Sequence, residues 1–522
     1  MALAIAVGGL ALGFAVVAKQ DLFQLAIPPT PAQLLAVAAA TGLALAVVRS
    51  PGLGLVLLVA FVYLNLSEVL VRHHGLPSLL QLLFVPLTLA AALAIHRDRL
   101  AALAGQGLGW GLVAYGLWIT ASSTWAWQPS LTDARTLETA KSLGIYLLVV
   151  LLANSLTRLR RAARTLVGVG ALLAGLGVFQ VARGDFRGEF GGLARIKHAQ
   201  IWGNVFESRI AGPLGDPNYF AQILVVAVPV ALALAWKAST LRGRATGYAA
   251  AALLAAGTVL TYSRGGALTL VVVLGLFVLV RRPRRRELLV GAALAGVLFV
   301  ALPSGFTRRL ITLEQVLPGG DEALHPDSSF EKRLLVTRTA WRMFLDHPLR
   351  GVGAGNYAVH FDTYAALVGS EAQEYDDQAA PNYPHSLYLE IAAETGVVGL
   401  ALFAAVLLAA LAGLLGARRR LVATGDAASA ALASGLSIAL VGYLVSSLFL
   451  HGHFQRYLWL LLAFAATLDL LARRGGPRAV AAGLPPAALE PRAGASGPGY
   501  AGELPGAGTG DPPSGDRSGG AA

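Results

Sequence analysis

Long apolar runs recur along the whole chain, and they constrain its fold more than any other feature. Each run is about 18–22 residues long, the length that a helix needs to cross a hydrocarbon layer about 30 Å thick. Of the 522 residues, 56% are hydrophobic and 13% are charged, and a water-soluble domain has no interior large enough for so much apolar surface. The runs are continuous and do not alternate, which disfavours a β-barrel. The sequence therefore predicts an all-α fold, a polytopic transmembrane helical bundle.

Hydropathy predicts about 12–14 membrane spans, with boundaries that carry an error of a few residues. The predicted spans cover roughly residues 2–18, 32–48, 53–70, 78–95, 107–122, 141–155, 163–182, 218–236, 245–262, 265–280, 287–303, 397–416, 428–450 and 455–472. The gap between 245–262 and 265–280 is so short that these two could be one span.

Arginine clusters in short loops predict the orientation, because cytoplasmic loops carry an excess of Lys and Arg. The clusters are Arg158 to Arg164, Arg242 with Arg244, Arg281 to Arg286, Arg418 to Arg420, and Arg473 with Arg474. Even numbers of predicted spans separate them, so all five fall on one face and both termini are cytoplasmic. The net charge of +12 is explained by these loops and does not indicate a nucleic-acid partner. The chain has no cysteine, which excludes disulfides and thiolate metal sites.

Composition divides the chain into five predicted segments. Residues 1–140 hold N-terminal transmembrane helices, and residues 141–303 hold central helices with an outer loop at 183–217. Residues 304–384 form a large periplasmic loop with seven Lys or Arg and eleven Asp or Glu, within which 330–345 has the spacing of an amphipathic helix. Residues 385–474 hold C-terminal transmembrane helices. Residues 475–522 are rich in Pro, Gly, Ala and Ser, which predicts a disordered cytoplasmic tail.

Arg209 is the first candidate site residue. It precedes Gly212 and the turn Asp216-Pro217-Asn218 in the outer loop, so we expect a fixed loop that ends at a helix start. Asp216 or Asn218 can cap the exposed N–H groups there. The alternative is a simple re-entry turn, with an arginine that reaches the lipid headgroups.

Arg264 is the second candidate, in Thr261-Tyr262-Ser263-Arg264-Gly265-Gly266 between two apolar runs. A cation near the membrane interior costs at least about 2.5–3.5 kcal/mol, so it usually has a partner or a function. The positive-inside bias does not explain it, because the predicted face is the outer one. The alternative is a structural pairing with a buried carboxylate.

His385 is the third candidate, and it follows Pro384 where the acidic loop meets a hydrophobic helix. An imidazole titrates at about pH 6.5 and can accept a proton at neutral pH. The alternative is an interfacial histidine with no special role. On the same predicted helix, Glu390 and Glu394 are expected to pair with arginines. The G-x-G-x-G run at 351–355 lacks the strand and helix context of a dinucleotide site, so we expect a tight turn there.

Two arginines and a histidine on one face of a membrane favour an anionic, lipid-linked substrate. The planar guanidinium suits phosphate oxygens, fixed cations stabilise a pyrophosphate leaving group, and a histidine accepts a proton from an attacking hydroxyl. Glycosyl transfer from a polyprenyl pyrophosphate glycan would use all three. No metal and no other cofactor is expected.

Roughly residues 140–470 resemble the bacterial O-antigen ligase and O-antigen polymerase superfamily. The resemblance rests on Arg209 with Gly212 and Asp216-Pro217-Asn218, on Ser263-Arg264-Gly265-Gly266, on His347-Pro348-Leu349-Arg350-Gly351-Val352-Gly353, and on Pro384-His385-Ser386 with Leu389, Glu394 and Gly396.

This resemblance implies a metal-independent, inverting transfer on the periplasmic face of the bacterial inner membrane. Arg209 and Arg264 would bind the donor pyrophosphate, and His385 would activate the acceptor hydroxyl. Asp216, Asn218, Ser263 and Glu394 would support them. The implied partners are a polyprenyl-pyrophosphate-linked glycan donor, a glycolipid or glycan acceptor such as lipid A–core, and the bilayer.

Several functions remain open within and outside this superfamily. A ligase moves a finished glycan to lipid A–core, a polymerase extends the glycan on its carrier, and related members transfer glycans to proteins. The alternative of a different class is a transporter or flippase for an anionic lipid-linked solute. It would need ionisable residues at mid-membrane, and the middle spans carry almost none.

Overall fold

The computed structural model describes residues 45–75, 86–91, 105–202, 205–282, 328–368, 383–452 and 456–474, with the single residues 42 and 285. The described residues all belong to one compact unit. The predicted spans 2–18 and 287–303, most of 32–48 and 78–95, and the predicted tail 475–522 lie outside the described residues.

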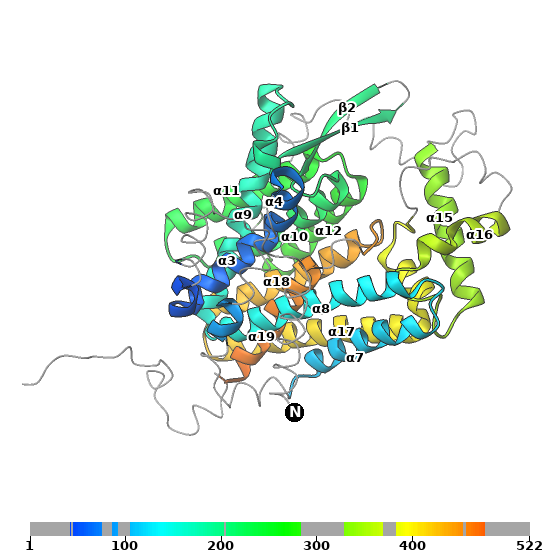
Figure 1. Ribbon diagram of the computed structural model, residues 1–522. Helices are drawn as coiled ribbons and strands as arrows, with labels where there is room; N and C mark the ends of the chain where they lie inside the picture. Colours follow the sequence, from blue (N-terminus) through cyan, green and yellow to red (C-terminus); the bar gives the residue numbers. More distant parts are fainter. Residues whose placement is uncertain are drawn as a thin grey trace, which may run out of the picture. The chain divides into compact units, whose positions relative to one another are not determined.

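Helices dominate the described part of the chain (Figure 1). In order, the elements are α3 (Pro51–Tyr63), α4 (Leu66–His74), α7 (Gly107–Ala121), η1 (Ser122–Thr124), α8 (Pro129–Leu152), α9 (Leu156–Arg183), η2 (Phe190–Gly192), β1 (Arg195–Trp202), β2 (Val205–Gly212), α10 (Pro217–Trp236), α11 (Leu241–Leu260), α12 (Arg264–Arg281), α15 (Ser328–Asp346), α16 (Tyr357–Val368), α17 (Leu387–Ala423), α18 (Ala427–Ser446) and α19 (Arg456–Arg474).

Side-chain caps explain why several of these helices begin where they do. Ser155, Thr240 and Asp426 each accept a hydrogen bond from a backbone N–H in the first turn of α9, α11 and α18, respectively. A helix leaves its first four N–H groups without intrahelical partners, and a short oxygen-bearing side chain satisfies one of them. The two closely spaced predicted spans, 245–262 and 265–280, are the separate helices α11 and α12.

Five described helices are long and apolar enough to cross a membrane: α9, α10, α12, α17 and α18. Helices α3 and α4, bent by 57° at a short break, form a sixth candidate. Helices α7, α8, α11 and α19 coincide with further predicted spans. Helix α7 has only 15 residues, and the other three carry charged residues toward their ends. The predicted class, an all-α multi-pass membrane protein, is confirmed.

Helices α10 and α18 form the centre of the bundle and are the most buried candidate spans. Small residues allow the backbones of α10 and α18 to approach closely where the two helices contact each other. A Cβ built on Gly435 of α18 would come within 2.8 Å of the Pro229 carbonyl oxygen of α10. Gly257 of α11 similarly approaches Ala174 of α9, at 2.8 Å from its Cβ. Close approach through small residues is the common packing mode between membrane helices.

The arginine-rich loops lie at one end of this bundle. Arg160 contacts Asp426 between α17 and α18, with a nitrogen–oxygen distance of 3.5 Å. Arg420 and Arg473 both bind Asp469 of α19, at 3.0 and 2.9 Å. Two of the five clusters that predicted a common face are therefore joined through Asp469, and a third pairs with Asp426 in the loop that follows Arg418 to Arg420.

The region of the predicted periplasmic loop contains two helices. The amphipathic helix predicted at 330–345 is α15, and α16 packs against it. Buried Val336, Met343, Tyr357 and Phe361 form a small second core beside the start of α17. Helices α15 and α16 thus form a small helical unit within residues 328–368.

Candidate functional site

Arg209 lies on strand β2 of an antiparallel hairpin, opposite Lys197 of β1. Its guanidinium is buried, with 6% of the residue exposed. The Nε atom donates to the Thr261 carbonyl oxygen at 2.8 Å, and Nη2 donates to Asn218 Oδ1 at 3.2 Å. Arg209 therefore bridges the end of α11 and the start of α10.

The hairpin was not predicted, since a fixed loop that ends at a helix start was expected around Arg209. A signal was present in the sequence. Gly203-Asn204 is a dipeptide typical of two-residue hairpin turns, and it separates two polar stretches that carry β-branched and aromatic residues. The hairpin matters because a strand with a paired neighbour holds Arg209 more rigidly than a loop would.

Asp216 begins α10 as its N-cap. Its Oδ1 accepts hydrogen bonds from the N–H groups of Asn218 at 2.8 Å and Tyr219 at 3.3 Å, and Pro217 occupies the first helical position. Lys197 lies 3.7 Å from the other carboxylate oxygen. The predicted capping turn is confirmed, and it orients Asn218 toward Arg209.

Arg264 is the first residue of α12, and Ser263 caps that helix by accepting from the Gly266 N–H at 3.2 Å. The preceding Tyr262 has a left-handed backbone, with φ of 54°, which turns the chain sharply between α11 and α12. Thr261, whose carbonyl binds Arg209, lies three residues before Arg264. Arg209 therefore binds the same turn of the chain that carries Arg264.

His385 lies between Pro384 and the N-cap Ser386 of α17. Its φ is 47°, a left-handed conformation in which non-glycine residues are uncommon and which concentrates at functional sites. Its ring packs edge-on against His451, with centroids 5.8 Å apart. His451 also stacks on Tyr383, at 4.3 Å and an interplanar angle of 6°.

Tyr219 connects this histidine pair to the arginines. Its ring meets His451 edge-on at 5.5 Å, and its hydroxyl donates to the His451 carbonyl oxygen at 3.1 Å. Tyr219 directly follows Asn218, which accepts from Arg209. A chain of contacts thus runs from Thr261 through Arg209, α10 and His451 to His385. The structure brings the neighbourhoods of all three predicted residues together.

Arg135 and Glu390 hold the segment that carries His451. Glu390 is buried in the first turn of α17 and pairs with Arg135 of α8 at 2.7 Å. Glu390 also accepts from the Gly452 N–H, while Arg135 donates to the Gly452 carbonyl oxygen at 3.2 Å. The expected pairing with an arginine is confirmed for Glu390, whereas among the described residues no such ion pair is found for Glu394. Arg135 was not predicted as a site residue, because it precedes the predicted span 141–155. His451 was also assigned no role from the sequence.

Glu394 and the glycine run form a packing contact. Glu394 accepts from the Tyr357 N–H at 3.3 Å, and its own carbonyl accepts from the Gly353 N–H at 2.9 Å. Helix α17 breaks at Gly396, where φ is 66° and ψ is −169°. A Cβ on Gly351 would come within 2.3 Å of the Glu394 backbone. The expected tight turn is confirmed, and two pieces of the resemblance, 347–353 and 394–396, pack directly on each other.

Two cavities are lined by described residues, and the second of them reaches the start of α17, where Leu387 and Ile391 line it. One, of about 220 Å³, is at the arginine-rich end of the bundle, and the other is a small apolar space among α7, α17, α18 and α19. Neither is lined by Arg209, Arg264 or His385. That these three side chains line one cavity open to the outer face stays a prediction.

A comparison with models of known protein families gives a match. Residues 249–404 match the O-antigen ligase family. The matched region contains Arg264, His385, Glu394 and the glycine run, while Arg209 precedes it. No curated protein matches the chain.

Proposed function

We propose that this chain is a membrane-embedded glycosyltransferase of the O-antigen ligase and polymerase superfamily, a proposal that the match of residues 249–404 to the O-antigen ligase family supports. It moves a glycan from a polyprenyl pyrophosphate carrier to a hydroxyl acceptor, which is lipid A–core or a similar glycolipid. The transfer takes place on the periplasmic face of the bacterial inner membrane.

In this proposal Arg209 and Arg264 bind the donor pyrophosphate. The leaving group gains negative charge as the bond from the anomeric carbon to its phosphate oxygen breaks. Guanidinium groups held in place by the protein stabilise that charge without having to reorganise. The hydrogen bonds from Arg209 to Thr261 and Asn218 support such preorganisation.

His385 acts as the general base. The acceptor hydroxyl attacks the anomeric carbon from the side opposite the pyrophosphate, and its proton passes to the imidazole. One carbon–oxygen bond forms as the other breaks, so the anomeric configuration inverts and polyprenyl pyrophosphate leaves. The positively charged imidazole then returns its proton to solvent. The transfer requires no metal ion in this scheme.

The contact chain from Thr261 through Arg209 and His451 to His385 is the observation that carries the proposal. Its members come from β2, α10, the turn between α11 and α12, the segment after α18 and the start of α17. These residues lie far apart in the sequence, and the fold brings them together where these helices and strands meet.

The same contacts support the placement on the outer face. The site lies where α10, α12 and α17 begin and α11 and α18 end, whereas the arginine clusters lie at the opposite ends of α11, α12 and α17. If the clusters are cytoplasmic, as the positive-inside rule predicts, the site faces the periplasm.

The polymerase reaction is the alternative within the superfamily, since it uses the same donor and the same chemistry on a different acceptor. A transporter or flippase is the alternative outside it. The most buried candidate spans, α10 and α18, contain no Asp, Glu, Lys or Arg, which disfavours transport of an anion through the bundle centre.

Reconstitution of the purified chain with a polyprenyl-pyrophosphate glycan, candidate acceptors and a chelator of divalent metals tests the proposal. We expect transfer of glycan with release of the pyrophosphate carrier. A product on lipid A–core identifies a ligase, and a lengthened glycan on the carrier identifies a polymerase. Movement of intact donor across the membrane without any transfer would instead identify a transporter.

A further inference from the structure

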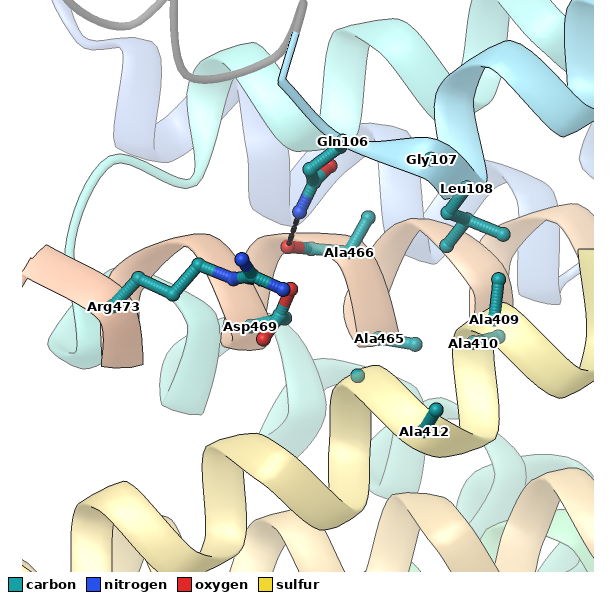
Figure 2. A pocket seen from close by; sticks show the side chains of 11 residues that line it. Gln106, Gly107, Leu108, Ala409, Ala410, Ala412, Ala465, Ala466, Asp469 and Arg473 are labelled. Atoms are coloured by element: carbon teal, nitrogen blue, oxygen red, sulfur yellow. Dashed lines mark hydrogen bonds and ion pairs between the residues drawn. The ribbon is translucent and has the colours of Figure 1, made fainter.

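A second candidate site lies at the other end of the bundle, in the cavity of about 220 Å³ between the start of α7, the middle of α17 and the end of α19 (Figure 2). Its apolar wall consists of small residues, including Ala409, Ala412 and Ala466. Gly107 and Ala412 are exposed at the surface, so the cavity opens outward between α7 and α17. Its volume is far above the about 10–15 Å³ that one water molecule needs.

Gln106 gives this cavity an unused hydrogen-bond acceptor. The side chain is 6% exposed, and its Nε2 donates to the Ala466 carbonyl oxygen at 2.9 Å. Its Oε1 is buried and has no hydrogen-bond partner within the described ranges. A buried acceptor without a partner costs about 1–3 kcal/mol, so a ligand that donates a hydrogen bond there would be favoured.

The cavity lining includes Asp469 and Arg473, and the ion-pair group that they form with Arg420, which lies outside the lining, has a formal net charge of +1. Asp469 is 5% exposed and is bound by both Arg420 and Arg473, so one carboxylate faces two guanidinium groups. Arg473 keeps 57% of its side chain exposed and lines the cavity (Figure 2). A ligand with one negative charge would balance the group.

A phospholipid can supply both the hydrogen-bond donor and the negative charge that this cavity favours. The open side of the cavity lies on the outer surface of the bundle, next to Leu408 and Leu415 of α17, which are 67% and 44% exposed. Exposed leucines on a membrane helix contact acyl chains. Basic pockets between membrane helices on the cytoplasmic side are known to bind anionic headgroups. A free phosphate compound would match the charge but would not use the exposed apolar surface.

We propose that this cavity binds the headgroup of an anionic phospholipid, with its phosphate at Arg473 and a headgroup hydroxyl donating to Gln106 Oε1. Phosphatidylglycerol carries both groups. The proposal does not depend on the reaction proposed above.

Native mass spectrometry of the full chain in detergent, with added phosphatidylglycerol or phosphatidylcholine, tests this site. We expect the wild type to retain phosphatidylglycerol preferentially. Replacing Arg473→Gln should weaken that retention about tenfold, the effect of one lost hydrogen bond to a charged group. Gln106→Leu should weaken it about two- to tenfold, because a hydrogen bond between neutral groups contributes less. Ala412→Leu, which narrows the opening, should weaken it as well.

Arg474→Gln is the matched control. It removes the same charge from the next position of α19 but does not line the cavity, so retention should be unchanged. Equal retention of the two lipids, or equal loss in the Arg473 and Arg474 variants, would overturn the proposal. Displacement of the lipid by an equal concentration of glycerol 3-phosphate in the wild type would also overturn it, because the ligand would then be a soluble phosphate. The lipid preference and the displacement by glycerol 3-phosphate are measured on the wild type alone, so these two tests do not depend on whether a variant folds.

Discussion

The three side chains proposed to act on the donor and acceptor are held by different means. Arg209 is fixed by hydrogen bonds to two other elements. Arg264 is fixed by its position at the first turn of a capped helix. His385 is fixed by a left-handed backbone and by its packing on His451. All three types of residue were predicted from the sequence, because a cation or an imidazole beside an apolar run is conspicuous. Their fixing contacts were not, since each partner lies far away in the sequence.

Loss of the imidazole at position 385 should abolish transfer and leave donor binding nearly intact. Removal of a general base slows a reaction by about 10²–10⁴-fold. Alanine is disfavoured at a φ of 47°, so His385→Asn is the better companion to His385→Ala, because asparagine tolerates this conformation. Turnover and donor binding are measured on purified protein. Unchanged turnover in either variant would exclude His385 as the base.

Arg264→Lys should impair transfer although the charge is kept. A planar fork that binds two phosphate oxygens is replaced by a point charge on a flexible stem, and the loss of one charge-assisted hydrogen bond lowers kcat/KM by about ten- to a hundred-fold. Arg281→Lys, at the far end of the same helix, is the control and should keep wild-type activity. Wild-type kcat/KM for Arg264→Lys would argue against a bidentate phosphate contact.

At the scale of elements, hydropathy located the helices well but not their breaks or the hairpin. Ten predicted spans coincide with described helices, because apolar runs and their arginine ends are local signals. The start of α8 at Pro129 was missed, since its first half is polar and packs against α19 and the segment at 352–356. The break of α17 at Gly396 was also missed, because it follows from a tertiary contact with residues 348–353.

The contact between the glycine run and α17 gives a prediction about stability. Gly351→Ala should destabilise the chain by more than about 2 kcal/mol, because alanine is strained at a φ of 67° and its Cβ would meet the Glu394 backbone. Gly275→Ala in α12 is the control, since a Cβ there meets nothing within 4 Å. Thermal unfolding in detergent measures both variants. Equal melting temperatures would show that the backbones do not pack as closely as described.

At the scale of the whole molecule, the bundle has two chemically different ends. One end holds ion pairs among the arginine-rich loops, Asp426 and Asp469. The other holds Arg209, Arg264 and His385 with their aromatic and carboxylate neighbours. The sequence predicted this division because positive charge in short loops reports orientation directly. It did not predict the cavity at the arginine-rich end, which depends on how α7, α17 and α19 pack.

Single-cysteine labelling tests the division of the two ends most directly, because the chain has no cysteine of its own and each introduced thiol reports only its own position. Arg264→Cys and Thr424→Cys place one thiol at each end, and Thr424 is exposed in the loop after α17. In intact bacterial cells whose outer membrane has been made permeable, a thiol reagent that cannot cross the inner membrane should label position 264. It should label position 424 only after the inner membrane is opened. The reverse pattern would place Arg264 on the cytoplasmic side and would contradict a periplasmic transferase site.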